Sequence, residues 1–91
     1  MKRVHINILG EVVQGVFFRA KINEKANALD VTGFVRNKDD GSVEAVFEGD
    51  DSDVDELLDF CREGPRGAQI EDVEIVEEEY DGEFEDFEIR Y

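Results

Sequence analysis

The chain has 91 residues, which is enough for one hydrophobic core, so we expect a single domain over residues 1–91. No run of about 18 apolar residues occurs, which excludes a membrane-spanning helix. The formal net charge is −15, and no basic stripe is present to displace counterions, so nucleic-acid binding is excluded as well. The start, Met1-Lys2-Arg3, lacks the apolar region of a signal peptide, and a lone Cys61 cannot form an internal disulfide. Both observations favour a cytoplasmic protein.

The acidic residues are concentrated in the second half of the chain. Residues 1–47 contain seven Lys or Arg and six Asp or Glu, whereas residues 48–91 contain three Arg and nineteen Asp or Glu. Three explanations stay open: adaptation to a salty cytoplasm, where repulsion between carboxylates is screened, a surface for a basic partner, and a disordered acidic segment. Regular apolar residues in the second half count against disorder, and the scarcity of Lys fits the halophilic explanation.

The first half of the chain has the pattern of three strands and one helix. Apolar and polar residues alternate over residues 4–8 and predict a strand. Apolar residues spaced by four and seven positions then predict an amphipathic helix over about residues 18–29. Two more strands are predicted over residues 31–37 and 43–47, joined by Asp-Asp-Gly at 39–41, which has the composition of a tight hairpin turn.

The second half predicts a helix and two further strands. Apolar residues at i, i+3, i+4 and i+7 predict a helix over residues 54–61, ended by the Gly-Pro pair at 64–65. Ser52, followed three residues later by an aspartate, resembles a capping box at the start of this helix. Apolar and polar residues alternate with one interruption over residues 70–76, which predicts a strand that either contains a bulge or does not. Residues 84–91 predict a short final strand.

These elements follow the order β-α-β-β-α-β, with the short strand added at the end. Because crossover connections between parallel strands are right-handed, this order places both helices on one face of an open sheet. The connection between the first predicted strand and the first predicted helix then lies at one end of the sheet.

That connection is the most informative segment of the chain. Residues 10–19, Gly-Glu-Val-Val-Gln-Gly-Val-Phe-Phe-Arg, form a glycine-punctuated turn that can direct several backbone N–H groups at one anion. Gly15 is the position where such a turn requires a positive φ or a close backbone approach. Arg19, one turn into the helix, can add a bidentate contact to the same anion. The alternative is that Arg19 is a surface helix residue, but Gln14-Gly15 directly upstream favours the anion site.

Other candidate residues have mainly structural explanations. Asn37 is either a turn residue or a carboxamide that holds a water molecule beside a phosphate, and both roles stay open. Phe17 and Phe18 are predicted to anchor the loop, His5 to be structural or exposed, and Cys61 to be a core thiol.

Several familiar chemistries lack the residues they need. The loop has neither the Lys nor the Ser or Thr of a Walker A motif, and no GxGxxG occurs. One His and one Cys cannot build a zinc or iron–sulfur site. Ser42 and Ser52 have no base beside them in the sequence, so a nucleophilic triad is not expected.

Two segments resemble the signatures of the acylphosphatases. They are residues 13–19, Val-Gln-Gly-Val-Phe-Phe-Arg, and residues 33–44, Gly-Phe-Val-Arg-Asn-Lys-Asp-Asp-Gly-Ser-Val-Glu. The Gly-Pro pair at 64–65 and the ending Phe-Glu-Ile-Arg-Tyr at 87–91 resemble the same family. The resemblance implies a ferredoxin-like α+β sandwich with an open, mostly antiparallel sheet. It also implies an enzyme that hydrolyses carboxyl phosphates such as acetyl phosphate or 1,3-bisphosphoglycerate.

The same resemblance implies roles for individual residues. Arg19 would bind the phosphoryl oxygens together with loop amides, and Asn37 would orient the attacking water, which makes these two the expected catalytic residues. The expected phosphate-binding residues are Gln14, Gly15, Val16, Phe17, Phe18 and Arg19. No metal, cofactor or covalent intermediate is expected, and the expected enzyme is a monomer acting on a small acyl phosphate. The alternative is a non-catalytic sensor or scaffold that binds acyl or carbamoyl phosphate, as a relative of the similar domain in hydrogenase-maturation proteins. Asn37 favours the enzyme, because a binder has no need to orient water.

Overall fold

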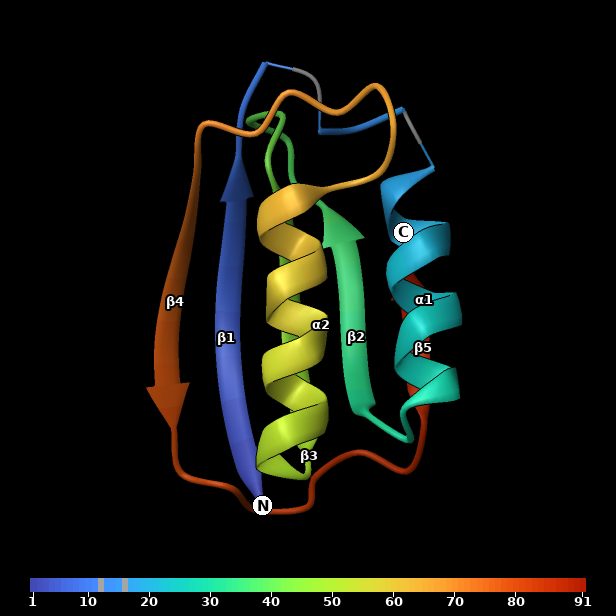
Figure 1. The fold of residues 1–91 in the computed structure, drawn as a ribbon, viewed down its shortest axis with the longest axis vertical. Helices are drawn as coiled ribbons and strands as arrows, with labels where there is room; N and C mark the ends of the chain where they lie inside the picture. The colour runs from blue at the N-terminus through green and yellow to red at the C-terminus, as the bar shows by residue number, and fades with distance from the viewer. Residues whose placement is uncertain (12, 16) are drawn as a thin grey trace.

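A computed structural model describes residues 1–11, 13–15 and 17–91. Five strands and two helices follow one another in the predicted order (Figure 1). They are β1 (Lys2–Leu9), α1 (Phe18–Ala28), β2 (Thr32–Asn37), β3 (Val43–Gly49), α2 (Asp51–Glu63), β4 (Asp72–Glu78) and β5 (Phe87–Arg90). None of the helices within these ranges is long and apolar enough to cross a membrane.

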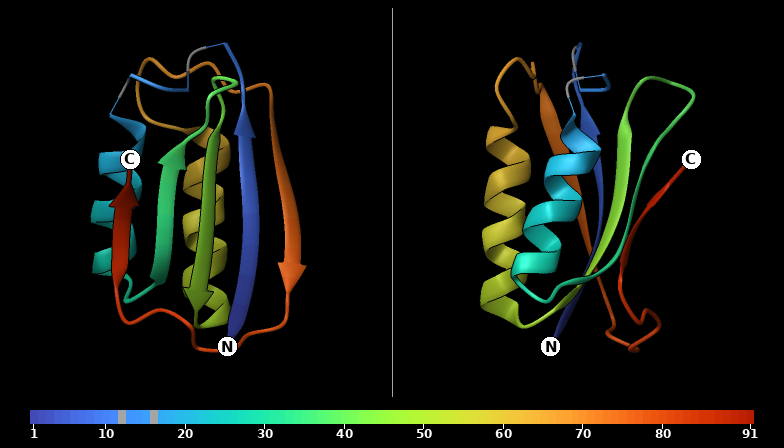
Figure 2. Two further views of the ribbon diagram at one scale, coloured as in Figure 1. Left: turned by 180° about the vertical axis from the view of Figure 1, so that it is seen from behind. Right: turned by 90° about the vertical axis from the view of Figure 1, so that its right-hand side faces the viewer.

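The five strands form one sheet in the order β4-β1-β3-β2-β5. β1 pairs antiparallel with β3 and with β4, and β2 pairs antiparallel with β3, whereas β2 and β5 run parallel. Both helices pack on the same face of this sheet, as the right-hand view of Figure 2 shows. The ferredoxin-like α+β fold and the mostly antiparallel open sheet are therefore confirmed.

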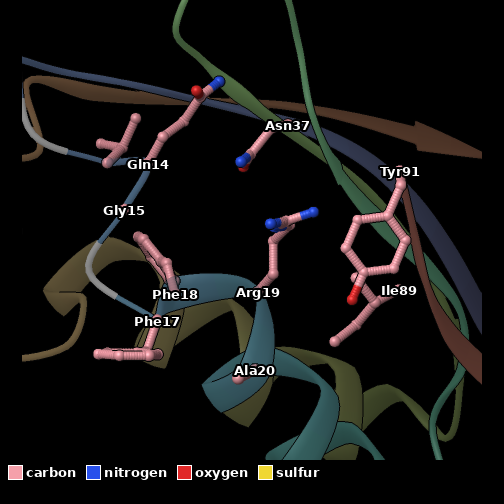
Figure 3. Close-up of a pocket in the computed structure, with 10 residues that line it drawn as sticks. Gln14, Gly15, Phe17, Phe18, Arg19, Ala20, Asn37, Ile89 and Tyr91 are labelled. Carbon is pink, nitrogen blue, oxygen red and sulfur yellow. The ribbon is translucent and has the colours of Figure 1, made fainter.

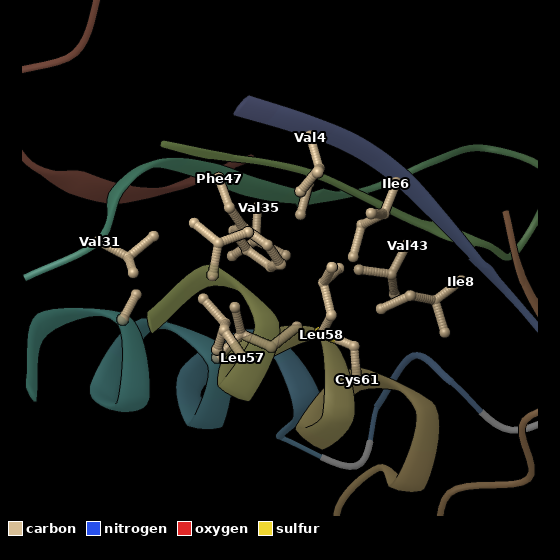
Figure 4. Close-up of a cluster of buried hydrophobic side chains, with 14 of the residues drawn as sticks. Val4, Ile6, Ile8, Val31, Val35, Val43, Phe47, Leu57, Leu58 and Cys61 are labelled. Carbon is tan, nitrogen blue, oxygen red and sulfur yellow. The ribbon is translucent and has the colours of Figure 1, made fainter. Parts of the chain in front are cut away.

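The core lies between the helices and the sheet (Figure 4). Alternate residues of β1 point into it, and Val4, Ile6 and Ile8 are each at most 1% exposed. Burial of one such side chain contributes about 1.5–3 kcal/mol relative to leaving it in water, which is why the period-two pattern fixes the face of the strand. Cys61 of α2 is fully buried in the same cluster, so the prediction of a core thiol is confirmed, and burial raises the pKa of this thiol.

The structure differs from the prediction at the start of α2, in the register of β4 and at the start of β5. α2 begins at Asp51 with Asp50 as its N-cap, and no side chain caps it, so the predicted capping box at Ser52 is wrong. The cause is the early break after Gly49, which lets the Asp50 carbonyl accept the first helical hydrogen bond from the Val54 amide at 2.9 Å. β4 pairs with β1 in an unbroken register, so no bulge forms, and the last strand begins at Phe87 rather than at residue 84.

The acidic second half is folded, because α2, β4 and β5 all lie within it. One arginine on the sheet face opposite the helices organises several of its carboxylates. The Arg3 guanidinium contacts Glu48 at 3.1 Å, Glu78 at 2.8 Å and Glu83 at 3.0 Å, and it lies 5.4 Å from the centre of the Phe84 ring. Arg3 thereby holds the connection between β4 and β5 against the sheet.

Candidate active site

The loop between β1 and α1 has the backbone that its glycine pattern predicts. Gly15 has a φ of 76°, and no atom lies within 4 Å of the position that a Cβ would take. Glycine is therefore required here for its backbone conformation rather than for space. Phe17, the N-cap of α1, is also left-handed, with a φ of 60°.

In the described part of the chain, the first turn of α1 contains no acidic side chain of its own. The N-cap forms no side-chain hydrogen bond. The N-terminus of a helix carries unsatisfied N–H groups and about half a positive charge, which together favour a bound anion. In a chain with 25 acidic residues, this acid-free helix start is suited to phosphate.

Arg19 extends from the first turn of α1 into the same region. Its guanidinium carbon lies 4.9 Å from the centre of the Tyr91 ring, so the ring face limits where the guanidinium can move. Among the described residues, no carboxylate lies within 4.0 Å of this guanidinium. The donors of Arg19 are thus not taken up by an internal ion pair.

Asn37 is the last residue of β2 and reaches the site from the opposite side. In Figure 3 its carboxamide and the Arg19 guanidinium point toward one another. The Asn37 Oδ1 atom is buried and has no hydrogen-bond partner in the described part of the chain. A buried acceptor without a partner costs about 1–3 kcal/mol, which a bound water or ligand could recover.

These groups surround a cavity of about 310 Å³. Its walls come from the β1–α1 loop, the first turn of α1, the end of β2 and the end of β5. The lining residues are Val13, Gln14, Gly15, Phe17, Phe18, Arg19, Ala20, Asn37, Ile89 and Tyr91.

The structure brings together the predicted site residues that it describes, whereas Val16 lies outside the described residues. Phe18 is 2% exposed and meets Phe60 edge to face, with the ring centres 6.0 Å apart, which confirms it as an anchor of the loop. The prediction that Phe17 is an anchor is wrong. Its left-handed N-cap backbone directs the ring outward, and the residue is 79% exposed.

Sequence reasoning gave no role to Ile89 and Tyr91. They reach the cavity because β5 pairs in parallel with β2, so that Gly33 lies opposite Phe87 and Val35 opposite Ile89. The sequence pattern of residues 84–91 predicted a strand, but it did not indicate which strand of the sheet β5 pairs with.

A second polar cluster lies on the sheet face away from the helices. Glu44 accepts hydrogen bonds from His5 at 2.7 Å and from Arg36. Burial acts to raise the pKa of Glu44, but these two hydrogen bonds outweigh it and hold the pKa below its usual value. His5 is thus a structural residue, as predicted.

The fold and the site together define a class: a ferredoxin-like α+β protein in which a glycine loop before a helix N-terminus, an arginine and the carboxamide of Asn37 lie around a small cavity. The acylphosphatase family model matches residues 4–89. An acylphosphatase from Syntrophus aciditrophicus is 52% identical over 91 residues, covering 100% of this chain and 94% of its own length.

Solved structures give the same result. The crystal structure of acylphosphatase from Bacillus subtilis has a TM-score of 0.93 and 28% identity, with 100% of both chains covered. An acylphosphatase from Coxiella burnetii has a TM-score of 0.89 and 35% identity, covering 98% of this chain and 92% of that one. The chain belongs to the acylphosphatase family, and it is therefore a hydrolase that acts on small acyl phosphates.

Proposed function

We propose that the cavity hydrolyses acyl phosphates, with Arg19 and the loop N–H groups binding the phosphoryl oxygens and Asn37 orienting the attacking water. The observation that carries the proposal is the buried Asn37 Oδ1, which has no partner in the described structure and faces Arg19 across the cavity. An acceptor in this position can accept a hydrogen bond from a water molecule while the Nδ2 group donates one to the phosphate.

The reaction needs little chemistry from the protein. The water oxygen forms a bond to phosphorus, the bond from phosphorus to the bridging carboxyl oxygen breaks, and the carboxylate leaves with the electron pair. Because a carboxylate is a good leaving group, no general acid is required, and positioning with charge stabilisation provides most of the acceleration. The phosphoryl group spreads its charge over three equatorial oxygens, which loop amides and one guanidinium can match.

The proton released by the water goes to the phosphate of the substrate. Among the lining residues that the structure describes, there is no Asp, Glu or His that could act as a base. A pH–rate profile of kcat that requires an ionising enzyme base near neutrality would contradict this assignment.

The proposal extends to the setting of the enzyme. We place it in the cytoplasm as a metal-independent monomer. The cavity lining supports metal independence, because the Arg19 guanidinium and the Asn37 carboxamide are donors suited to an anion, and the described lining residues include none of the carboxylates that a hard cation prefers.

The test is phosphate release from an aryl acyl phosphate in the presence of EDTA. Asn37→Ala should lower kcat by about 100-fold, the cost of one transition-state hydrogen bond, and leave the inhibition constant of inorganic phosphate nearly unchanged. Arg19→Ala should weaken phosphate inhibition as well as kcat, because it removes a ligand of the anion. Asn27→Ala is the matched control, since Asn27 lies on the exposed side of α1. Wild-type kcat in Asn37→Ala, or activity lost with EDTA, would contradict the proposal.

The acidity is proposed to be an adaptation to salt. Nineteen acidic residues lie within residues 48–91, and their mutual repulsion is screened over about 3 Å in molar salt but over about 30 Å in 10 mM salt. The midpoint of urea denaturation should therefore rise from dilute to molar KCl. An unchanged midpoint would remove this explanation.

A further inference from the structure

Gln14 lines the cavity, but its side-chain N–H donors are directed elsewhere. Its Nε2 group donates to the backbone oxygen of Lys38 at 2.8 Å and to that of Ser42 at 2.8 Å. A primary amide has two N–H donors, so both are used by these carbonyls. Figure 3 shows the Gln14 side chain reaching away from Arg19 toward the β2–β3 hairpin.

The two acceptors are the ends of the hairpin turn. The Lys38 amide itself donates to the Ser42 carbonyl at 2.9 Å, and Asn37 pairs with Val43 in the preceding rung of the ladder. Gln14 therefore binds the hairpin directly beside Asn37, although it lies 24 residues before Lys38 in the chain. Gly15, the next residue of the loop, lines the cavity.

We propose that Gln14 is a positioning residue that fixes the Asn37 carboxamide relative to the anion-binding loop. The inference rests on the proposed role of Asn37 in orienting water. Because Asn37 Oδ1 has no partner in the described residues, no hydrogen bond on that atom fixes the side chain, and its place depends on the backbone of the hairpin. Loss of the Gln14 hydrogen bonds would let the hairpin move against the loop while Arg19 and the loop amides stay in place.

The first experiment separates positioning from phosphate binding. Gln14→Met has nearly the same length but no donor, and Gln69→Met is the matched control because Gln69 is exposed. Gln14→Met should lower kcat by roughly 10- to 100-fold, the cost of about 1 Å of misplacement, while the inhibition constant of inorganic phosphate stays within about twofold. An inhibition constant that rises as much as kcat falls would overturn the proposal, because Gln14 would then be a phosphate ligand.

The second experiment asks whether Gln14 acts through Asn37. In an Asn37→Ala background, Gln14→Met should cause no further loss of kcat, since the group that it positions is absent. An equal loss in both backgrounds would overturn the proposal. If Asn37→Ala alone keeps wild-type kcat, the proposed role of Asn37 in orienting water is wrong. This result comes from the single Asn37 variant, so it is distinguishable from a failure of the Gln14 proposal.

A third experiment does not depend on turnover, so it can also be applied to variants whose activity is too low to measure. The side-chain amide signals of Asn37 in a ¹⁵N–¹H spectrum should shift in Gln14→Met and stay in place in Gln69→Met. Unmoved Asn37 signals in a folded Gln14→Met protein would refute the positioning role. If Gln14→Met fails to fold, Gln14→Asn, which keeps the polar amide but is one methylene too short to hold both carbonyls, replaces it in all three measurements.

Discussion

Replacing Arg3 with methionine is expected to destabilise the protein by about 3 kcal/mol, because it leaves a buried carboxylate without its counter-charge. The Glu48 side chain is 1% exposed, the Arg3 side chain is 15% exposed, and their closest atoms are 3.1 Å apart. Breaking a fully buried pair by removing one partner costs about 3–5 kcal/mol, and the partial exposure of Arg3 places this pair at the lower end. The Glu48 Oε1 atom already lacks a partner among the described residues, and without Arg3 the Oε2 atom keeps only the neutral Asp81 amide at 3.3 Å, which supplies no counter-charge.

The double variant Arg3→Met/Glu48→Met isolates this cause. Replacing a buried ion pair with apolar side chains of similar size is often close to neutral, so the double variant should recover most of the lost stability. Arg62→Met provides the matched control. It breaks an exposed pair with Asp59, whose side chains are 55% and 78% exposed, and should cost about 0.5 kcal/mol or less.

The assay is urea unfolding followed by far-UV circular dichroism, at one fixed KCl concentration, because the chain has no tryptophan. Arg3→Met should lower the midpoint without changing the slope. The reasoning would be refuted if Arg3→Met cost no more than Arg62→Met. It would also be refuted if the double variant cost the sum of the single variants Arg3→Met and Glu48→Met, since the buried charge would then not be the source.

Three further predictions concern other parts of the fold. Gly33→Ala should prevent native folding, because its Cβ would lie 1.8 Å from the Val46 carbonyl oxygen, whereas Gly41→Ala, with nothing within 4 Å, should cost only about 1 kcal/mol, as urea unfolding can measure. The pKa of Glu44 is lower in the folded than in the unfolded state, so its stabilisation is present above pH 4.5 and is lost as the pH falls below it. Glu44→Gln should therefore be less stable than wild type at pH 7 by a margin that shrinks on acidification, and a constant margin would contradict the assignment. The Cys61 thiol is buried and its pKa is raised, so a thiol reagent should label it only after unfolding, and rapid labelling of the native protein would be inconsistent with this burial.

The arrangement of helices and strands could be predicted because burial leaves a periodic pattern. Val4, Ile6 and Ile8 alternate in sequence for the same reason that all three face the helices. The start of α2 could not be located in the same way, because several of the acidic residues before Val54 are equally suitable as caps. Which aspartate becomes the cap depends on where β3 leaves the sheet, and that is decided by tertiary pairing.

In the candidate site too, the residues with a local sequence pattern could be predicted and those that depend on tertiary pairing could not. Gly15, Arg19 and Asn37 carry local signals, since a turn, a helix start and a strand end each restrict the residue type. No local pattern indicates that Tyr91 lines the cavity or that the Gln14 side chain binds the β2–β3 hairpin, because both depend on segments that meet only in the folded sheet. Motif reasoning therefore found Gly15, Arg19 and Asn37 of the candidate site and missed the contacts that enclose the cavity or hold the hairpin beside it.

β4 forms one edge of the sheet (Figure 1), and an edge strand exposes backbone N–H and C=O groups to which another strand can add. On this strand Val76 is 57% exposed, which would favour such pairing, but Glu74 and Glu78 flank it on the same face and Glu77 is exposed on the other. Two molecules approaching edge to edge would bring these carboxylates together. Part of the acidity thus protects the chain from polymerising through its own sheet, and lowering the pH until the carboxylates are protonated would remove that protection.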